Sequence, residues 1–206
     1  MKFGILIFPE VEELDFAGPW EMVGMWTKFA GGPEERLIVS QSSTPVECAN
    51  GLSINPDVAF DKCPVLDFLL VPGGQGTRQE GENEVLIGFI VEQAKNCKAV
   101  LSVCTGSFLL HKAGLLSGKK TTTHWNSLER MREFGDVTVV EKRFVKDGNI
   151  WSSSGVSAGI DLMLAFIEDF AGEEAAGTVQ FAAEYYPSGK IYGGFNKHSK
   201  APGYLK

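Results

Sequence analysis

One cysteine of the chain stands where a catalytic nucleophile could be held. Cys104 lies in the segment SVCTGS (102–107), after the apolar run AVLSV and before GSFLLHKAGLL, which has the composition of a helix. A sharp turn from strand to helix leaves no room for side chains two positions before and after its apex, and Ser102 and Gly106 are small. The pattern predicts a nucleophile elbow with Cys104 as a covalent catalyst.

The surroundings of this elbow determine the predicted reactivity of the thiol. The first turn of a helix offers unpaired N–H groups and a positive dipole end, so we expect the pKa of Cys104 to be lowered. These N–H groups, together with those of the turn at Gly73 and Gly74, could bind a developing anion. The alternative is that Cys104 is a small buried core residue, the commonest role of a free cysteine.

The elements that must position these residues alternate along the chain. Continuous apolar runs typical of buried strands occur at 2–8, 35–41, 67–74 and 99–103. Helices are expected at 15–29, 83–96, from the elbow to about 113, and at 126–133, 157–172 and 173–186. Asp15 could cap the first helix. The alternation predicts an α/β fold with a doubly wound, mostly parallel sheet sandwiched by helices.

Two short sequence signals and one rule of topology complete the expected fold. Asn50-Gly51 and Asp147-Gly148 indicate two hairpin turns. Ligand sites of parallel sheets lie beyond the carboxyl ends of the strands. Three segments should therefore meet at one edge: the loop after the first strand, with its acidic residues up to Asp15, the turn at 72–76, and the elbow.

The composition favours a small-molecule function. The net charge of the 206 residues is −7 without any basic run, which argues against nucleic-acid binding. The N-terminal apolar run is too short for a signal peptide or a membrane span, so a cytoplasmic protein is expected. We expect one domain over 1–186 and an irregular or partner-contacting tail over 187–206.

The cysteines and histidines show no metal-site or disulfide pattern. No CxxC pair occurs, and no histidine has zinc-ligand spacing beside a cysteine. In a reducing compartment the cysteines would be free thiols. They are Cys48, Cys63, Cys97 and Cys104.

Four segments together resemble the ThiJ/PfpI superfamily, relatives of the class I glutamine amidotransferase domain, over about residues 3–185. They are LDFAGPWEM, DFLLVPGGQGT, AVLSVCTGSFLLHKAGLLSGKKTTTHW and GVSAGIDLML. The resemblance implies a flavodoxin-like fold and a homodimer. Amidopeptidase-like members have His after the elbow cysteine where this chain has Thr105, and many glyoxalase-like members have Glu at the place of Asp15. Both departures favour the branch of bacterial isocyanide hydratases, whose motifs also occur in the ligand-domain half of some AraC-type regulators.

The resemblance implies a mechanism that needs no metal or organic cofactor. Cys104 would attack the terminal carbon of an isocyanide while its nitrogen takes a proton, giving a covalent thioimidate. Asp15 would donate a proton and then activate the water that releases an N-substituted formamide. Thr105 would hold Asp15 or the thiol, and the N–H groups of Gly74 and Thr105, with Gly73 in the same turn, would bind developing charge.

The role of His124 is not fixed by the sequence, and three functions other than isocyanide hydration are compatible with it. His124 could approach the site or only pack beside it. The same thiol would serve a glyoxalase or deglycase acting on reactive carbonyls, or a redox sensor oxidised at Cys104. A small-ligand sensor related to the regulators is weakened, because the sequence contains no helix-turn-helix pattern.

Overall fold

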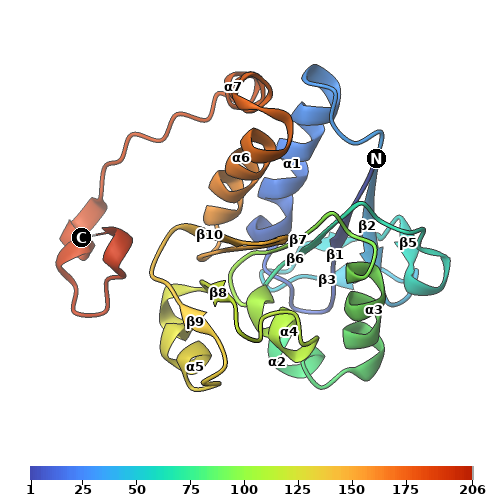
Figure 1. Ribbon diagram of the computed structural model, residues 1–206, viewed down its shortest axis with the longest axis horizontal. Coiled ribbons are helices and arrows are strands. Elements are labelled where there is room, and N and C mark those ends of the chain that lie inside the picture. The colour runs from blue at the N-terminus through green and yellow to red at the C-terminus, as the bar shows by residue number, and fades with distance from the viewer. Residues whose placement is uncertain (206) are drawn as a thin grey trace.

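A seven-stranded sheet forms the centre of the protein, in a computed structural model that describes residues 1–205 (Figure 1). Its strands are β1 (Lys2–Leu6), β2 (Glu35–Ser40), β5 (Val58–Ala59), β6 (Phe68–Val71), β7 (Ala99–Ser102), β10 (Phe144–Asp147) and β11 (Ile150–Ser153). The strand order is β10-β11-β7-β6-β1-β2-β5, and only the β10–β11 pair is antiparallel. The predicted mostly parallel sheet is confirmed.

Helices cover both faces of this sheet. They are α1 (Glu13–Phe29), α2 (Thr77–Glu80), α3 (Glu84–Ala94), α4 (Gly106–Lys112), α5 (Leu128–Arg132), α6 (Ala158–Ala171) and α7 (Glu173–Ala182). The helices α1, α6 and α7 pack together on one face, whereas α2, α3 and α4 lie on the other (Figure 1). This layering confirms the predicted sandwich.

The apolar runs form strands of the central sheet because both faces of this sheet bury their side chains away from water. In β1, the four residues Phe3 to Leu6 are all buried. Trp26 of α1 and Phe166 of α6 meet Phe68 of β6, with ring centroids 5.3–6.3 Å apart, in the layer between sheet and helices. Large aromatic side chains contribute much of the apolar burial that holds such layers together.

Both predicted hairpins are present. The strands β3 (Val46–Glu47) and β4 (Ser53–Ile54) pair antiparallel around Asn50-Gly51, and Gly51 has a φ of 90°. β10 and β11 pair around Asp147-Gly148, and Gly148 has a φ of 64°. A positive φ suits glycine, which has no Cβ to collide with the backbone. A further short parallel pair joins β8 (Lys120–Thr121) to β9 (Thr138–Val139).

The first helix begins earlier than its sequence predicts. α1 starts at Glu13, with Glu12 as the N-cap residue and no side-chain capping bond. Asp15 is already in the first turn and is fully buried. The prediction that Asp15 caps this helix is therefore wrong, because its side chain points into the protein toward the end of β6.

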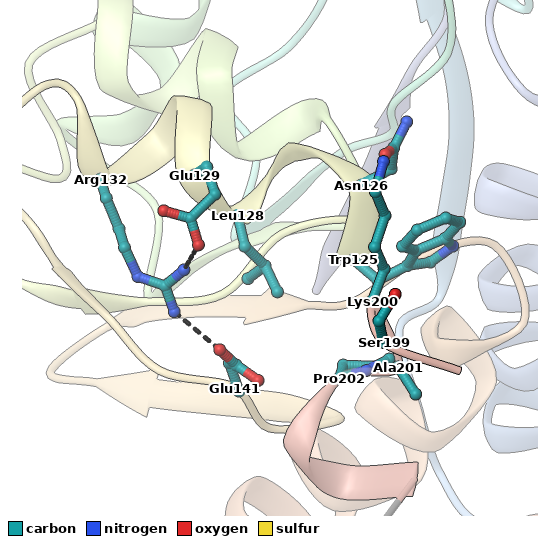
Figure 2. Close-up of a pocket in the computed structure, with 10 residues that line it drawn as sticks. All are labelled: Trp125, Asn126, Leu128, Glu129, Arg132, Glu141, Ser199, Lys200, Ala201 and Pro202. Carbon is teal, nitrogen blue, oxygen red and sulfur yellow. Dashed lines mark hydrogen bonds and ion pairs between the residues drawn. The ribbon is translucent and has the colours of Figure 1, made fainter. Parts of the chain in front are cut away.

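The C-terminal segment carries two short 3-10 helices, Tyr192–Lys197 and Gly203–Leu205. Between them, residues 199–202 line a cavity of about 410 Å³ with Trp125 and Leu128 (Figure 2). The N–H of Gly203 donates to Glu141 Oε2 over 2.8 Å. The domain boundary at 186 stays a prediction. No helix within residues 1–205 is long and apolar enough to cross a bilayer.

Candidate active site

Three chain segments meet at the carboxyl ends of β1, β6 and β7. Val11 pairs with Gly74 in an isolated bridge, and the N–H of Glu12 donates to the carbonyl of Gly73 over 3.0 Å. The N–H of Gly73 donates to Asp15 Oδ2 over 2.8 Å, and the N–H of Gly74 donates to Thr105 Oγ1 over 3.0 Å. The predicted convergence of the three segments is confirmed.

Cys104 occupies a tight turn between β7 and α4. Its φ of 57° lies in the left-handed region, which costs a residue other than glycine about 1–2 kcal/mol. Four hydrogen bonds hold the strained turn. The N–H of Cys104 donates to the carbonyls of Ser153 and Ser154 over 3.2 Å each, and its carbonyl accepts from Thr123 Oγ1 over 2.9 Å and from Ser107 Oγ over 3.2 Å. A Cβ at Gly106 would lie 2.1 Å from the carbonyl oxygen of Val71. The turn therefore requires glycine at position 106, in agreement with the small residue that a nucleophile elbow needs two positions after its apex.

Asp15 presents a buried carboxyl to this turn. The side chain is fully buried, and Oδ1 has no hydrogen-bond partner among the described residues. Burial raises the pKa of Asp15 to about 8, although the Gly73 N–H, the Cys104 thiol and the Val156 N–H act to lower it. The negative charge of Glu12 adds to the increase. Asp15 is thus an acid that keeps its proton at neutral pH.

The pKa of the Cys104 thiol is raised, whereas the sequence predicted that it would be lowered. The residue is 6% exposed, and burial followed by the charge of Asp15 raises the pKa of its thiol, while the N–H groups of Thr105 and Val156 and the Thr105 hydroxyl act to lower it. The expected lowering by the following helix is wrong, because α4 begins only at Gly106 and desolvation outweighs the N–H groups. With Asp15 also protonated, the resting pair carries two protons.

A cavity of about 150 Å³ opens onto Cys104 and Thr105. His124 lines it, and its Nδ1 accepts from the N–H of Asn126 over 3.3 Å, so the neutral ring carries its proton on Nε2. Burial lowers the pKa of His124. A Cβ at Gly155 would lie 2.3 Å from this ring, which shows how closely the backbone after β11 supports it.

The predicted glycine amides serve the protein itself. The N–H groups of Gly73 and Gly74 were expected to face a developing anion, yet they are bonded to Asp15 and Thr105. Thr105 Oγ1 also lies 3.2 Å from Thr77 Oγ1. The two amides therefore hold the Asp15 carboxyl and the Thr105 hydroxyl in place at the site.

Val156 and Arg78 belong to the site, and sequence reasoning missed both. Val156 follows β11 with a φ of 51°, unusual for a β-branched residue, and its N–H faces both Cys104 and Asp15. Its signal was topological, since β11 pairs with β7 and ends at the same edge. Arg78 of α2 lines the cavity as well, and only the position of the preceding Gly-rich turn could have indicated it. No group of three or more His, Cys, Asp or Glu suited to a metal ion occurs within the described chain.

Fold and site together define an α/β protein with a buried acid beside a cysteine at a strand-to-helix turn. The model of the DJ-1/PfpI family matches residues 1–169. The chain belongs to this family.

Individual relatives are similar over most of the chain. An isonitrile hydratase from Pseudomonas putida is 38% identical over 189 residues, which cover 91% of this chain and 80% of the relative. The HTH-type transcriptional regulator GbdR from Pseudomonas aeruginosa is 32% identical over 86% of this chain, which spans about half (49%) of the regulator's length. The crystal structure of a ThiJ/PfpI family protein from Pseudomonas syringae superposes with a TM-score of 0.86 at 32% identity, covering 95% of this chain and 79% of the other.

Proposed function

We propose that this protein hydrates isocyanides to N-substituted formamides, with Cys104 as nucleophile and Asp15 as general acid and base. The observation that carries the proposal is the fully buried Asp15, whose pKa of about 8 keeps a transferable proton beside the cysteine at neutral pH. The similarity to an isonitrile hydratase at 38% identity supports this choice of reaction.

The first step adds the thiol across the isocyanide carbon. Asp15 donates its proton to the isocyanide carbon, and the Cys104 sulfur bonds to this same carbon as the thiol proton passes to the Asp15 carboxylate; the nitrogen takes up its proton only in the second step. The product is a thioimidate whose carbon carries sulfur and one hydrogen, so atoms and charge balance. This route needs no free thiolate at rest, in keeping with the raised pKa of Cys104.

The second step uses water. Asp15, which is protonated again after the first step, donates its proton to the substrate nitrogen and accepts a proton from the attacking water, whose oxygen bonds to the thioimidate carbon. Breaking the carbon–sulfur bond then forms the formamide carbonyl and returns the proton to the thiol. The net reaction consumes one isocyanide and one water.

The remaining residues position this pair. Gly73 fixes the Asp15 carboxyl, and Gly74 fixes the hydroxyl of Thr105. The N–H groups of Thr105 and Val156 face the sulfur, where they would stabilise negative charge during attack and release. His124 lines the same cavity as Cys104, and we assign it a role in shaping this cavity. Assembly as a homodimer stays a prediction that light scattering would test.

Two other functions use the same thiol. A glyoxalase would convert methylglyoxal to lactate through a thiohemiacetal. A redox sensor needs a thiolate that oxidants can reach. A cysteine residue that is 6% exposed, with a raised thiol pKa, disfavours this role.

The deciding experiment compares two reactions of the purified protein. Formamide production from an aryl isocyanide is measured beside lactate production from methylglyoxal, with Cys104→Ser as the control in both. We expect formamide to form only with the parental protein. Lactate without formamide would establish the glyoxalase instead, and turnover by Cys104→Ser would remove the nucleophile assignment.

A further inference from the structure

A second cavity, of about 190 Å³, lies beside the Cys104 cavity, and Arg78 lines both. The helices α2, α4 and α5 form the second cavity, which also contains Phe108, Lys112 and Arg130. Nothing in the hydration mechanism above uses this space. Its position next to the reaction centre makes it a natural place for the part of a substrate that does not react.

Arg130 is presented to this cavity in a way that leaves its donors open. Its guanidinium lies over the ring of Phe108, 3.9 Å from the centroid, and the side chain is half-buried. This cation–π contact uses no oxygen acceptor, so the N–H groups of Arg130 remain available for hydrogen bonds to an anion. Within residues 1–205, no hydrogen bond or ion pair occupies these N–H groups.

The positive charge of Arg78 is likewise not paired with a carboxylate of the described chain. Its guanidinium donates to Oε1 of Gln75, a neutral group, and no carboxylate of the described chain lies within ion-pair distance of it. Arg78 and Arg130 are close enough to repel each other: burial and the charge of Arg78 both lower the pKa of Arg130. The charge of Glu133 raises the pKa of Arg130, although the two residues form no ion pair.

The other charges of the cavity cancel. Lys112 pairs with Glu82, with Nζ 2.7 Å from Oε1, and both line the cavity. The two arginines therefore leave an excess of two positive charges in one small cavity of a protein whose net charge is −7. Placing two such groups together costs free energy unless an anion binds between them.

We infer that Arg78 and Arg130 bind a carboxylate carried by the substrate, so that the preferred substrates are isocyanides bearing an acid group. This inference rests on the proposed hydratase function. The isocyanide carbon would meet Cys104 in the first cavity, and the carboxylate would reach past Arg78 into the second. Planar guanidinium groups suit a carboxylate because they can donate two parallel hydrogen bonds to it.

The kinetic experiment compares an acid with its ester. Isocyanoacetate and 3-isocyanopropanoate are assayed against their methyl esters, which have the same reactive group without the charge. We expect the parental protein to prefer one of the acids by about 10- to 100-fold in kcat/KM, the range of a hydrogen-bonded charge pair. Arg78→Gln and Arg130→Gln should each bring the ratio of acid to ester close to one.

The matched control is Arg132→Gln, because Arg132 lies on the same short helix but pairs with Glu129 and with Glu141, the latter over 2.8 Å (Figure 2). This variant should keep the preference of the parental protein for the acid. Equal turnover of acid and ester by the parental protein, or a preference that survives Arg130→Gln, would overturn the inference while leaving the hydratase function intact.

A binding measurement separates the inference from the reaction. Cys104→Ser is titrated by calorimetry with N-formylglycine, the product expected from isocyanoacetate, and with its methyl ester. Binding of the acid alone, lost in the double variant with Arg130→Gln and weakened by salt, supports the carboxylate site even if no isocyanide is hydrated. Hydration of isocyanides without any binding of N-formylglycine would refute the site and retain the proposed function.

Discussion

Replacing Asp15 by Asn removes a titratable proton and keeps the shape of the side chain. The parental carboxyl is fully buried, and burial raises its pKa from 3.8 to about 8. The folded state therefore holds the proton between these pH values, whereas the unfolded chain has already lost it. Because ionisation inside the fold is unfavourable, the stability of the parental protein falls as pH rises from about 4 to about 8.

The size of this effect follows from the linkage between protonation and folding. Each unit of pKa shift corresponds to about 1.36 kcal/mol, so the interval from about pH 5 to pH 8 accounts for roughly 4 kcal/mol as an upper bound. Asn has no proton to lose, so the stability of Asp15→Asn relative to the parental protein should increase over the same interval. In a domain of this size, that difference amounts to roughly 10 °C in Tm.

The assay is urea unfolding at pH 5, 7 and 9, with Glu13→Gln as the matched control in the same turn of α1. Desolvation acts to raise the pKa of Glu13, but the hydrogen bonds that it accepts, chiefly from Asn50, together outweigh desolvation and lower the pKa; its contribution to stability is therefore present above its ordinary pKa and lost in acid. The stability of Glu13→Gln relative to the parental protein should therefore stay constant from pH 5 to pH 9.

Kinetics on the same variant test the chemical role. Asp15→Asn should lower isocyanide hydration by roughly 100- to 10,000-fold, the usual contribution of general acid–base catalysis. A stability difference that does not change with pH would refute the raised pKa of Asp15. Turnover at the parental rate would refute the proton shuttle and the hydratase mechanism with it.

Four further predictions concern the same edge of the sheet. For the parental protein, kcat/KM for an isocyanide should fall as pH rises through about 8, because Asp15 must be protonated to donate; a profile flat to pH 10 would exclude it as the acid. Cys104→Ser should fold normally and show no turnover above background, as circular dichroism and a formamide assay would establish. Asp15→Glu should lose activity although it keeps the acid, because its extra methylene enters a fully buried position; full activity in a steady-state assay would contradict this close fit. Gly106→Ala should destabilise the fold by about 2 kcal/mol or more, since its Cβ would meet the Val71 carbonyl at 2.1 Å, whereas Gly177→Ala, with nothing within 4 Å, should be neutral or stabilising in thermal unfolding.

The sequence predicts this fold well where one residue type has one physical explanation. A strand of a parallel sheet is buried on both faces and therefore needs a continuous apolar run. The run from Phe3 to Leu6 meets this requirement, and few other structures would bury it completely. Asn50-Gly51 and Asp147-Gly148 specify turns because glycine tolerates a positive φ. The rule that ligand sites lie beyond the carboxyl ends of parallel strands then brings Asp15, Gly73 and Thr105 together before any side chain is placed.

Predictions fail where one residue type allows two roles. Asp near a helix start is a good cap, and the sequence allows Asp15 to be both a cap and a member of the site; its burial and the missing side-chain capping bond exclude the cap. Glycine amides after a strand suit an anion site, yet Gly73 and Gly74 donate to side chains of the protein. Sequence spacing shows which groups meet but not which donors they use up, because that depends on side-chain directions set by packing.

The error in the thiol pKa has a more general cause. Helix N–H groups favour a thiolate, but their effect competes with desolvation, and Cys104 is only 6% exposed and lies beside an acid that is itself buried. A lowered thiol pKa would suit a sensor that must react with soluble oxidants. Two protons held by a buried Cys–Asp pair suit an addition in which one proton is delivered to the substrate as sulfur attacks. The same burial that makes Cys104 a poor free thiolate therefore favours the proton-coupled chemistry proposed for it.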